Sequence, residues 1–270
     1  MNRKWMSTPY LVWSIAFIII PLCMVFYYGF TDKTGAFTLA NIIAITMEEH
    51  MKALWLSMLL SFISTIICIL LAYPLALILC NLSVNQNSFL VLIFILPMWM
   101  NFLLRTLAWQ TLLEKTGVIN SILTSLHLPP LTIINTPYAI ILGMVYNFLP
   151  FMVLPIYNSL SKIDPNVVNA ARDLGANSIQ TFFKVIFPLS LPGVISGITM
   201  VFVPALTTFV ISNLLGGSKI LLIGNVIEQE FTQTNNWNLG SGLSIVLMIF
   251  IIISIIISTI TDKDGEGSSL

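Results

Sequence analysis

The sequence has 270 residues, of which 57% are hydrophobic and 8% charged, and its formal net charge at pH 7 is +0. A soluble domain usually carries about a quarter charged residues, so this composition excludes an ordinary soluble protein and predicts an integral membrane protein. No run of Lys or Arg suggests a nucleic-acid partner. Cys23, Cys68 and Cys80 lie in apolar runs without metal-ligand spacing, and we interpret them as small hydrophobic residues.

Six apolar runs are long enough to cross a bilayer, which requires about 20 mostly apolar residues. They predict spans at about residues 10–30, 53–79, 89–107, 137–160, 191–215 and 241–260. We therefore expect an all-α membrane protein in which residues 1–270 form one transmembrane domain. Six spans place both termini and the connection 161–190 on the same side, and Arg3 with Lys4 favours a cytoplasmic start.

The connection 108–136 is long and mostly uncharged. Its apolar residues recur at helical spacing, which predicts an amphipathic helix that lies on the bundle or at the membrane interface. These residues are Ile119, Ile122, Leu123 and Leu126. Residues 216–240 form the other sizeable connection on that side of the membrane.

The connection 161–190 is soluble-looking and carries helix-boundary residues. Asp164 can cap a helix whose first residue is Pro165, and Gly175 can end it in a left-handed conformation. Small and apolar side chains then share one narrow helix face. They are Val167, Ala170, Ala171 and Leu174. Asn177 or Ser178 can cap a second short helix, which we expect to end near Pro188. Two short helices with a small-residue face suggest a docking device.

The sequence shows no pattern typical of a hydrolytic, redox or ATP-binding site. The two histidines, His50 and His127, lie in separate connections, and the Gly216–Lys219 stretch fails the phosphate-loop pattern. The six runs contain no Asp or Glu, which disfavours coupling to a proton or sodium gradient. Arg105, near the end of a span, is interpreted as reaching toward the membrane interface. We expect no catalytic residue, no metal and no cofactor, so that energy for any active transport comes from a partner.

The connection 161–190 resembles the cytoplasmic EAA loop of ABC-importer permease subunits. The resemblance covers Asn169-Ala170-Ala171-Arg172-Asp173-Leu174-Gly175-Ala176 and, after Phe182, Phe187-Pro188-Leu189 with Pro192-Gly193-Val194. Asn169 stands where the family usually has Glu, so the salt bridge that Glu would make with the ATPase is not expected here, although Asn can still form a hydrogen bond. Phe187 stands where Leu or Ile is common.

Three further segments resemble the B-type (PotB-type) permease of spermidine/putrescine importers. They are Leu96-Pro97-Met98-Trp99 with Leu104-Arg105-Thr106, Asn147-Phe148-Leu149-Pro150-Phe151-Met152, and Leu214–Lys219 with Leu222–Ile227. The resemblance implies a type I ABC-importer permease fold in a bacterial cytoplasmic membrane, with cytoplasmic termini. It also implies a heterodimer with a C-type permease, two ATPase subunits that bind ATP and Mg, an extracytoplasmic polyamine-binding protein and contact with membrane lipid.

The resemblance assigns ATPase coupling to one set of residues. They are Asn169, Ala170, Ala171, Arg172, Asp173, Leu174, Gly175 and Pro188. A polycation also needs carbonyls, carboxylates and aromatic faces along its path. The candidates are Trp99, Tyr146, Asn147, Glu228 and Glu230.

Two alternatives stay open. The first is a permease of the same kind that carries another small solute, such as an amino acid, sulfate or an iron complex. The second is a membrane scaffold or channel that needs no ATPase.

Overall fold

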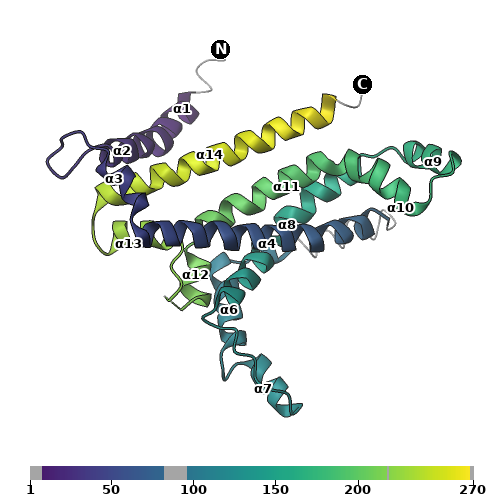
Figure 1. Cartoon of the computed structure of the whole chain (residues 1–270), viewed down its shortest axis with the longest axis horizontal. Helices are drawn as coiled ribbons and strands as arrows, with labels where there is room; N and C mark the ends of the chain where they lie inside the picture. Colours follow the sequence, from purple (N-terminus) through teal and green to yellow (C-terminus); the bar gives the residue numbers. More distant parts are fainter. Residues whose placement is uncertain (1–7, 82–95, 218, 268–270) are drawn as a thin grey trace.

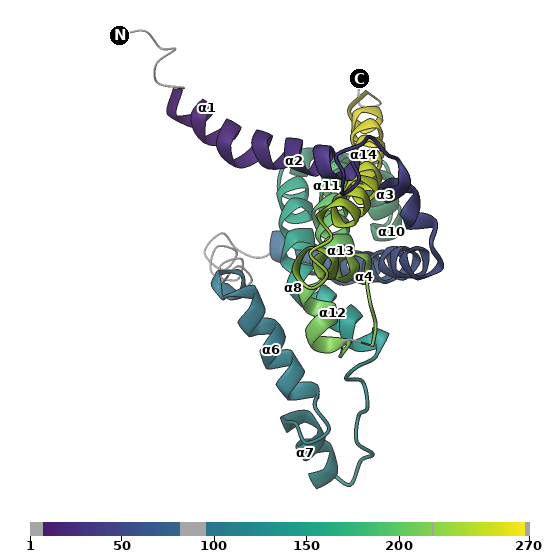
Figure 2. The same ribbon diagram turned by 90° about the vertical axis from the view of Figure 1, so that its left-hand side faces the viewer.

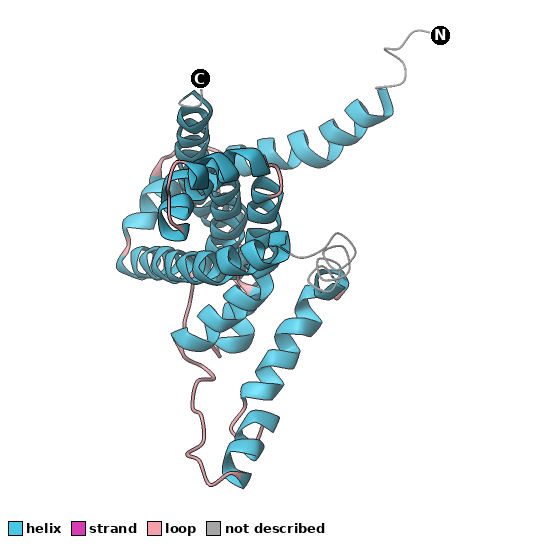
Figure 3. Ribbon diagram, turned by 90° about the vertical axis from the view of Figure 1, so that its right-hand side faces the viewer, coloured by secondary structure: helices cyan, strands magenta, loops and turns pink. Residues whose placement is uncertain are grey.

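The computed structural model describes residues 8–81, 96–217 and 219–267. Within these ranges the regular structure is helical, apart from one isolated antiparallel bridge between Thr31 and Phe37 (Figures 1 and 3). Five helices among the described residues are long and apolar enough to cross a membrane. They are Pro9–Gly29, Glu48–Cys80, Pro137–Leu160, Ser178–Thr207 and Trp237–Ile260. The prediction of an all-helical membrane protein is therefore confirmed.

The described part of the chain contains helices of very different lengths. In chain order they are α1 (Thr8–Ser14), η2 (Ile15–Ile19), α2 (Ile20–Gly29), α3 (Ala40–Ile43), η3 (Ala44–Thr46), α4 (Glu48–Asn81), α6 (Phe102–Leu113), α7 (Val118–Ser125), α8 (Pro137–Leu160), α9 (Pro165–Asp173), α10 (Ser178–Thr181), η4 (Phe182–Ile186), α11 (Phe187–Thr207), α12 (Val210–Leu215), α13 (Ile223–Thr232) and α14 (Trp237–Gly267).

Helices α4 and α8 form the centre of the bundle and run in the same direction. Ser64 Oγ of α4 lies 3.4 Å from Met144 Sδ of α8, and Cys80 Sγ lies 3.8 Å from the Tyr157 carbonyl oxygen. Later residues of one helix thus meet later residues of the other. Because the two helices are parallel, the chain returns from one end of the bundle to the other between Asn81 and Pro137.

Helix α11 packs against α8 in the opposite direction through glycines. A Cβ atom at Gly193 would lie 2.6 Å from the Pro155 carbonyl oxygen, and one at Gly197 would lie 2.6 Å from Met152 Sδ. Glycine at these positions allows the backbones to approach, as is common between helices in membranes. The buried core therefore lies between α4, α8 and α11.

Helix α1 and the η2 turn diverge from the bundle, whereas α2 packs against α14 (Figure 2). The most apolar stretch of Pro9–Gly29 has no buried residue in this chain. Trp13 and Phe17 are among its exposed aromatic side chains. Such a surface suits lipid or another apolar helix.

Two predicted spans need correction. The prediction 89–107 lies partly outside the described residues, and the part within them is interrupted at Asn101, whose side chain accepts hydrogen bonds from Leu103 N and Leu104 N and so starts α6. The predicted single span 191–215 is wrong, because α11 ends at Thr207 and α12 is a separate helix. Thr208 is extended, and the backbone of Gly224 packs so closely on it that a Cβ atom there would lie 3.1 Å from the Thr208 carbonyl oxygen.

The connections also differ from one another in how well they were predicted. The helix expected within 108–136 is confirmed as α7, but it lies beyond α6 and away from the bundle (Figure 2), and its place at the membrane interface stays a prediction. Helix α13, within residues 216–240, was not predicted. It is held by Asn225, whose Oδ1 accepts from Ser212 Oγ (2.5 Å) and whose Nδ2 donates to Asn213 Oδ1 (2.7 Å). Helix α12 and the first turn of α13 are therefore tied together by a buried polar network.

Candidate functional site

The connection between α8 and α11 begins with a capped helix, as the sequence predicts. Asp164 is extended, and its Oδ1 accepts a hydrogen bond of 2.9 Å from Asn166 N. Pro165 occupies the first turn of α9, where a missing N–H costs nothing. Helix α9 lies beyond the end of the bundle, opposite the end that holds α12 and α13 (Figure 1).

The end of α9 follows the Schellman pattern. Gly175 has φ +85°, its N–H donates to the Arg172 carbonyl (2.9 Å), and Ala176 N donates to the Ala171 carbonyl (3.1 Å). These bonds satisfy carbonyls that a helix end leaves free. The predicted glycine stop is confirmed, and its physical reason is the left-handed conformation.

A second helix starts at Asn177 but does not end near Pro188, so that expectation was wrong. Asn177 Oδ1 accepts from Gln180 N (2.8 Å), and Gln180 Oε1 accepts from Asn177 N (3.0 Å), which is a capping box. The helix then widens into the π turn η4, where Phe187 N donates to the Phe182 carbonyl, and continues as α11. This wider turn accommodates Pro188, which would otherwise clash and leave a carbonyl without its donor.

One aromatic cluster anchors this segment to the bundle. The Phe182 ring packs edge-on against Tyr73 of α4, with centroids 5.6 Å apart, and also contacts Phe187. Tyr73 Oη lies 2.6 Å from Ser190 Oγ. Sequence reasoning missed Tyr73, because nothing in its apolar run distinguishes it from its neighbours. The cluster links the connection to both α4 and α11.

The outer surface of the segment is apolar and uncovered. Leu174 is 90% exposed, Ile179 70% and Phe183 64%. The predicted coupling residues surround Leu174: Asn169, Ala170, Arg172, Asp173 and Gly175 are exposed, and Ala171 is half-buried. We call residues 164–183 the coupling segment. Exposed leucine and phenylalanine on capped, well-anchored helices are typical of a docking surface.

The candidate residues of the solute path lie in separate places. Trp99 is 75% exposed. Tyr146, on α8, packs edge-on against Trp109 with centroids 5.2 Å apart, and both line a cavity of about 410 Å³. Asn147 is 1% exposed, and its Nδ2 donates to the Gly143 carbonyl (2.9 Å). These positions were proposed for a cation path, and they stay predictions.

Glu228 and Glu230 lie on α13, at the end of the bundle far from the coupling segment. The Thr232 hydroxyl donates to Glu228 Oε1 (3.1 Å), and the Thr234 hydroxyl donates to Glu230 Oε2 (2.7 Å). Glu230 lines a cavity of about 290 Å³, whereas Glu228 lines a different, mostly apolar one of about 440 Å³. The cavity at Glu230 also contains Glu49, His50, Lys52 and Lys219. The two carboxylates therefore do not form one acidic pair.

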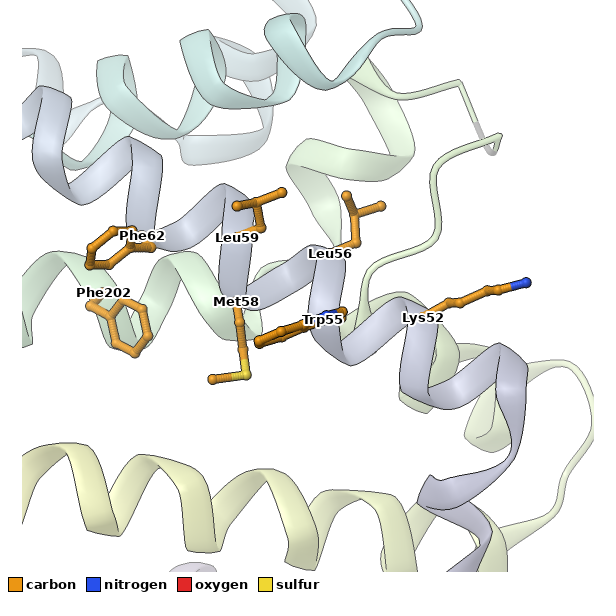
Figure 4. Close-up of a pocket in the computed structure, with 7 residues that line it drawn as sticks. All are labelled: Lys52, Trp55, Leu56, Met58, Leu59, Phe62 and Phe202. Carbon is orange, nitrogen blue, oxygen red and sulfur yellow. The ribbon is translucent and has the colours of Figure 1, made fainter.

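A larger cavity, of about 650 Å³, lies along α4 and α11. Figure 4 shows Trp55, Met58, Phe62 and Phe202 turned toward the side of α14, while Lys52 extends from one end. Its lining has one positive charge and no carboxylate, so it suits an acyl chain or an apolar helix better than a polycation.

Comparison with known proteins places these features in context. The family profile described as "Binding-protein-dependent transport system inner membrane component" matches residues 3–263. The chain is 38% identical over 253 residues to the spermidine/putrescine transport system permease protein PotB of Haemophilus influenzae, covering 91% of this chain and 88% of the relative. It is 38% identical over 245 residues to PotB of Escherichia coli, covering 88% and 89%.

The fold is also similar to a solved structure. That structure is a crystal structure of a bacterial ABC transporter that imports the acidic polysaccharide alginate. The TM-score is 0.77 at 16% identity, over 97% of this chain and 94% of the other. At that identity the likeness concerns the fold alone.

Proposed function

The chain belongs to the family of binding-protein-dependent transport system inner membrane components, and from this premise we propose that it is the permease subunit of an ATP-driven importer of polyamines. The assignment of polyamines as the transported solute rests on the 38% identity to spermidine/putrescine permeases over about nine-tenths of the chain. The chain is a component of a transport system rather than an enzyme, and we assign ATP hydrolysis to a separate subunit.

Six crossings of the membrane fit the arrangement of the helices. The parallel directions of α4 and α8 support one further crossing between Asn81 and Pro137 besides the five apolar helices. With six crossings both termini and the coupling segment lie on one side. We assign that side to the cytoplasm, because Arg3 and Lys4 precede the first span.

The coupling segment supports the proposed mechanism. Leu174 and the small residues around it would enter a groove on the ATPase subunit, and Gly175, which has no side chain, would let the partner come close. When ATP draws two such subunits together, the segment would move with its subunit. The contacts of Phe182 with Tyr73 and Phe187 would then carry this movement to α4 and α11 as a lever.

The rest of the assembly follows from the same premise. A second, C-type permease would complete the passage, and a polyamine-binding protein would deliver solute at the end that carries α12 and α13. In the described spans no Asp or Glu is buried. Binding within this subunit would therefore be weak and transient, with selectivity held by the binding protein. The buried Asn147 and the exposed Tyr146 beside it on α8 remain proposed contacts, with Glu228 and Glu230 as those at the outer rim.

Uptake of labelled spermidine and putrescine tests the proposal. Cells that lack this subunit but keep the other components should lose uptake, and the gene should restore it. Amino acids, sulfate and iron complexes added in excess should not compete. Uptake that is unchanged by loss of the subunit would overturn the cargo assignment. A deletion of residues 164–188 that spares uptake would overturn the ATP-driven mechanism and favour a channel or scaffold.

A further inference from the structure

Helix α10 passes into α11 through the π turn η4, where the backbone is weakly held. Phe187 N donates to the Phe182 carbonyl, five residues back instead of four. Pro188, the next residue, has no N–H to donate. A turn with this spacing and a missing donor is a common place for a helix to bend. The backbone is therefore a weak constraint on the direction of the coupling segment relative to α11.

One side chain of α4 contacts both ends of this turn. The Tyr73 ring packs edge-on against Phe182, with centroids 5.6 Å apart, and contacts Phe187, with centroids 5.8 Å apart. Its hydroxyl lies 2.6 Å from Ser190 Oγ, in the first turn of α11. Tyr73 is 7% exposed and Ser190 is 0% exposed. A single buried residue of α4 thus touches the start of the π turn, its end and the helix that follows.

The hydroxyl groups form a short chain of hydrogen bonds that ends at the π turn. Ser190 Oγ donates to the Phe187 carbonyl (2.9 Å), and a serine hydroxyl has one proton. The Tyr73 hydroxyl is therefore the donor to Ser190. The amide of the same Phe187 closes the π turn onto Phe182. The hydrogen bonds thus connect α4 to the residue at which the turn closes.

The bond between Tyr73 and Ser190 differs from the other contacts of these two helices. Among the side chains that the structure describes, it is the one hydrogen bond that joins α4 to α11. Apolar contacts allow packed helices to slide or rotate by small amounts. A buried hydrogen bond resists such movement, because breaking it leaves a donor and an acceptor unsatisfied.

We propose that the Tyr73 hydroxyl locks the coupling segment to α4 and α11, so that Tyr73 and Ser190 are positioning residues for coupled transport. The inference rests on the proposed function, in which the ATPase moves the coupling segment. With the bond in place, the segment and both helices move as one body. Without it, the segment would bend at the π turn, and ATP would be hydrolysed with less movement of α4 and α11. The hydroxyl then sets how much solute is carried for each ATP, and not whether the ATPase binds.

Removal of the hydroxyl alone tests the lock. Tyr73→Phe keeps both ring contacts and removes the bond to Ser190. In liposomes that hold the complete transporter, we expect spermidine uptake per ATP hydrolysed to fall by roughly 2- to 10-fold, the range expected for one buried hydrogen bond. Binding of the ATPase subunit should not change. Ser190→Ala should give the same loss, and the double variant should be no worse than either single one, because all three lack the same bond.

A matched control comes from α8. Tyr157 is half-buried in the last turn of α8, and within the described residues its hydroxyl has no hydrogen-bond partner. Tyr157→Phe should therefore leave the ratio of uptake to hydrolysis at the wild-type value. A fall as large as that of Tyr73→Phe would show a general effect of losing a hydroxyl and would overturn the lock.

The ratio of uptake to hydrolysis separates the lock from a purely structural role. A variant that is merely unstable would lose uptake and ATP hydrolysis in the same proportion, and that result for Tyr73→Phe would overturn the lock. If the wild type is coupled and Tyr73→Phe is equally coupled, the lock is wrong and the proposed function stands. A wild-type transporter without ATP-dependent uptake would refute the proposed function and the lock with it.

Discussion

Replacement of Gly175 separates two reasons why a glycine stands in the coupling segment. Its φ of +85° is unfavourable for residues with a Cβ atom, by roughly 1–2 kcal/mol for alanine and less for asparagine. A Cβ atom at Gly175 would meet no atom of this chain within 4 Å. The chain itself therefore sets no size limit there, and any steric limit comes from a docked partner.

The two reasons predict opposite orders of uptake and ATPase association for Gly175→Ala and Gly175→Asn. If only φ matters, asparagine should be better tolerated than alanine, because asparagine adopts the left-handed conformation more readily. If the ATPase approaches closely, the larger asparagine should be worse. Overpacking costs about 1–3 kcal/mol, which corresponds to about a 5- to 150-fold loss of association with the ATPase subunit.

We predict the second order, in which uptake and ATPase co-purification fall from glycine through alanine to asparagine and are abolished by Gly175→Trp. Membrane insertion should not change, and the thermal stability of the permease should fall only by the cost of the left-handed conformation, which is smaller for asparagine than for alanine. If the Gly175→Asn variant supports uptake as well as the wild type, the close approach of the ATPase to Gly175 is refuted. If the Gly175→Trp variant supports uptake, the lever mechanism itself is refuted.

Three further changes follow from the structure. Leu174→Asp, at a side chain that is 90% exposed, should sharply reduce ATPase co-purification without altering membrane insertion, and equal co-purification would show that the apolar face is not the contact. Asn225→Leu should lower stability by about 3 kcal/mol or more, seen as a lower unfolding midpoint, because it leaves Ser212 Oγ, Leu222 N and other buried partners unpaired. The Thr34 hydroxyl and the Ala36 and Thr34 amides hold the pKa of Asp32 below its ordinary value. Because the folded pKa is lowered, the contribution of Asp32 to loop order is present above the unfolded pKa of about 4 and is lost as pH falls through the folded one. Exchange of the Thr34 and Ala36 amides should therefore accelerate relative to the intrinsic rate on acidification, and Asp32→Asn should remove that dependence.

The coupling segment could be predicted in detail because its structure is set by nearby residues. Asp164 and Pro165 start α9, Gly175 ends it, and Asn177 starts the next helix through bonds that span six residues or fewer. The helical spacing in 118–126 was sufficient for α7 for the same reason. Local chemistry decides these elements before packing does.

The interruptions of the spans could not be predicted, because distant residues produce them. Hydropathy is continuous through Thr208, yet the helix is interrupted at this residue. Gly224 packs against Thr208 there, and Asn225 donates to the Phe209 carbonyl. Helix α13 depends in turn on Ser57 of α4, whose hydroxyl accepts from Ile223 N (2.8 Å). The continuation of α10 into α11 depends on a π turn, which no residue type announces.

The candidate site divides in the same way. The coupling residues could be named from a sequence motif, whereas Tyr73 lies 96 residues before Asn169, in an apolar run, and could not. The solute-path candidates were chosen by residue type. The structure buries Asn147 within the bundle, leaves Tyr146 exposed at a cavity on α8, and places the two glutamates on opposite sides of α13, facing different cavities. A path that joins them would have to be completed by the proposed partner subunits.

The most direct test of the central claim is spermidine uptake by liposomes that contain this permease with its partner permease, ATPase and binding protein. We predict uptake that requires ATP on the side of the coupling segment and is lost when Gly175 is replaced by tryptophan. Uptake at the same rate without ATP, or with the tryptophan variant, would contradict energy entry through this segment.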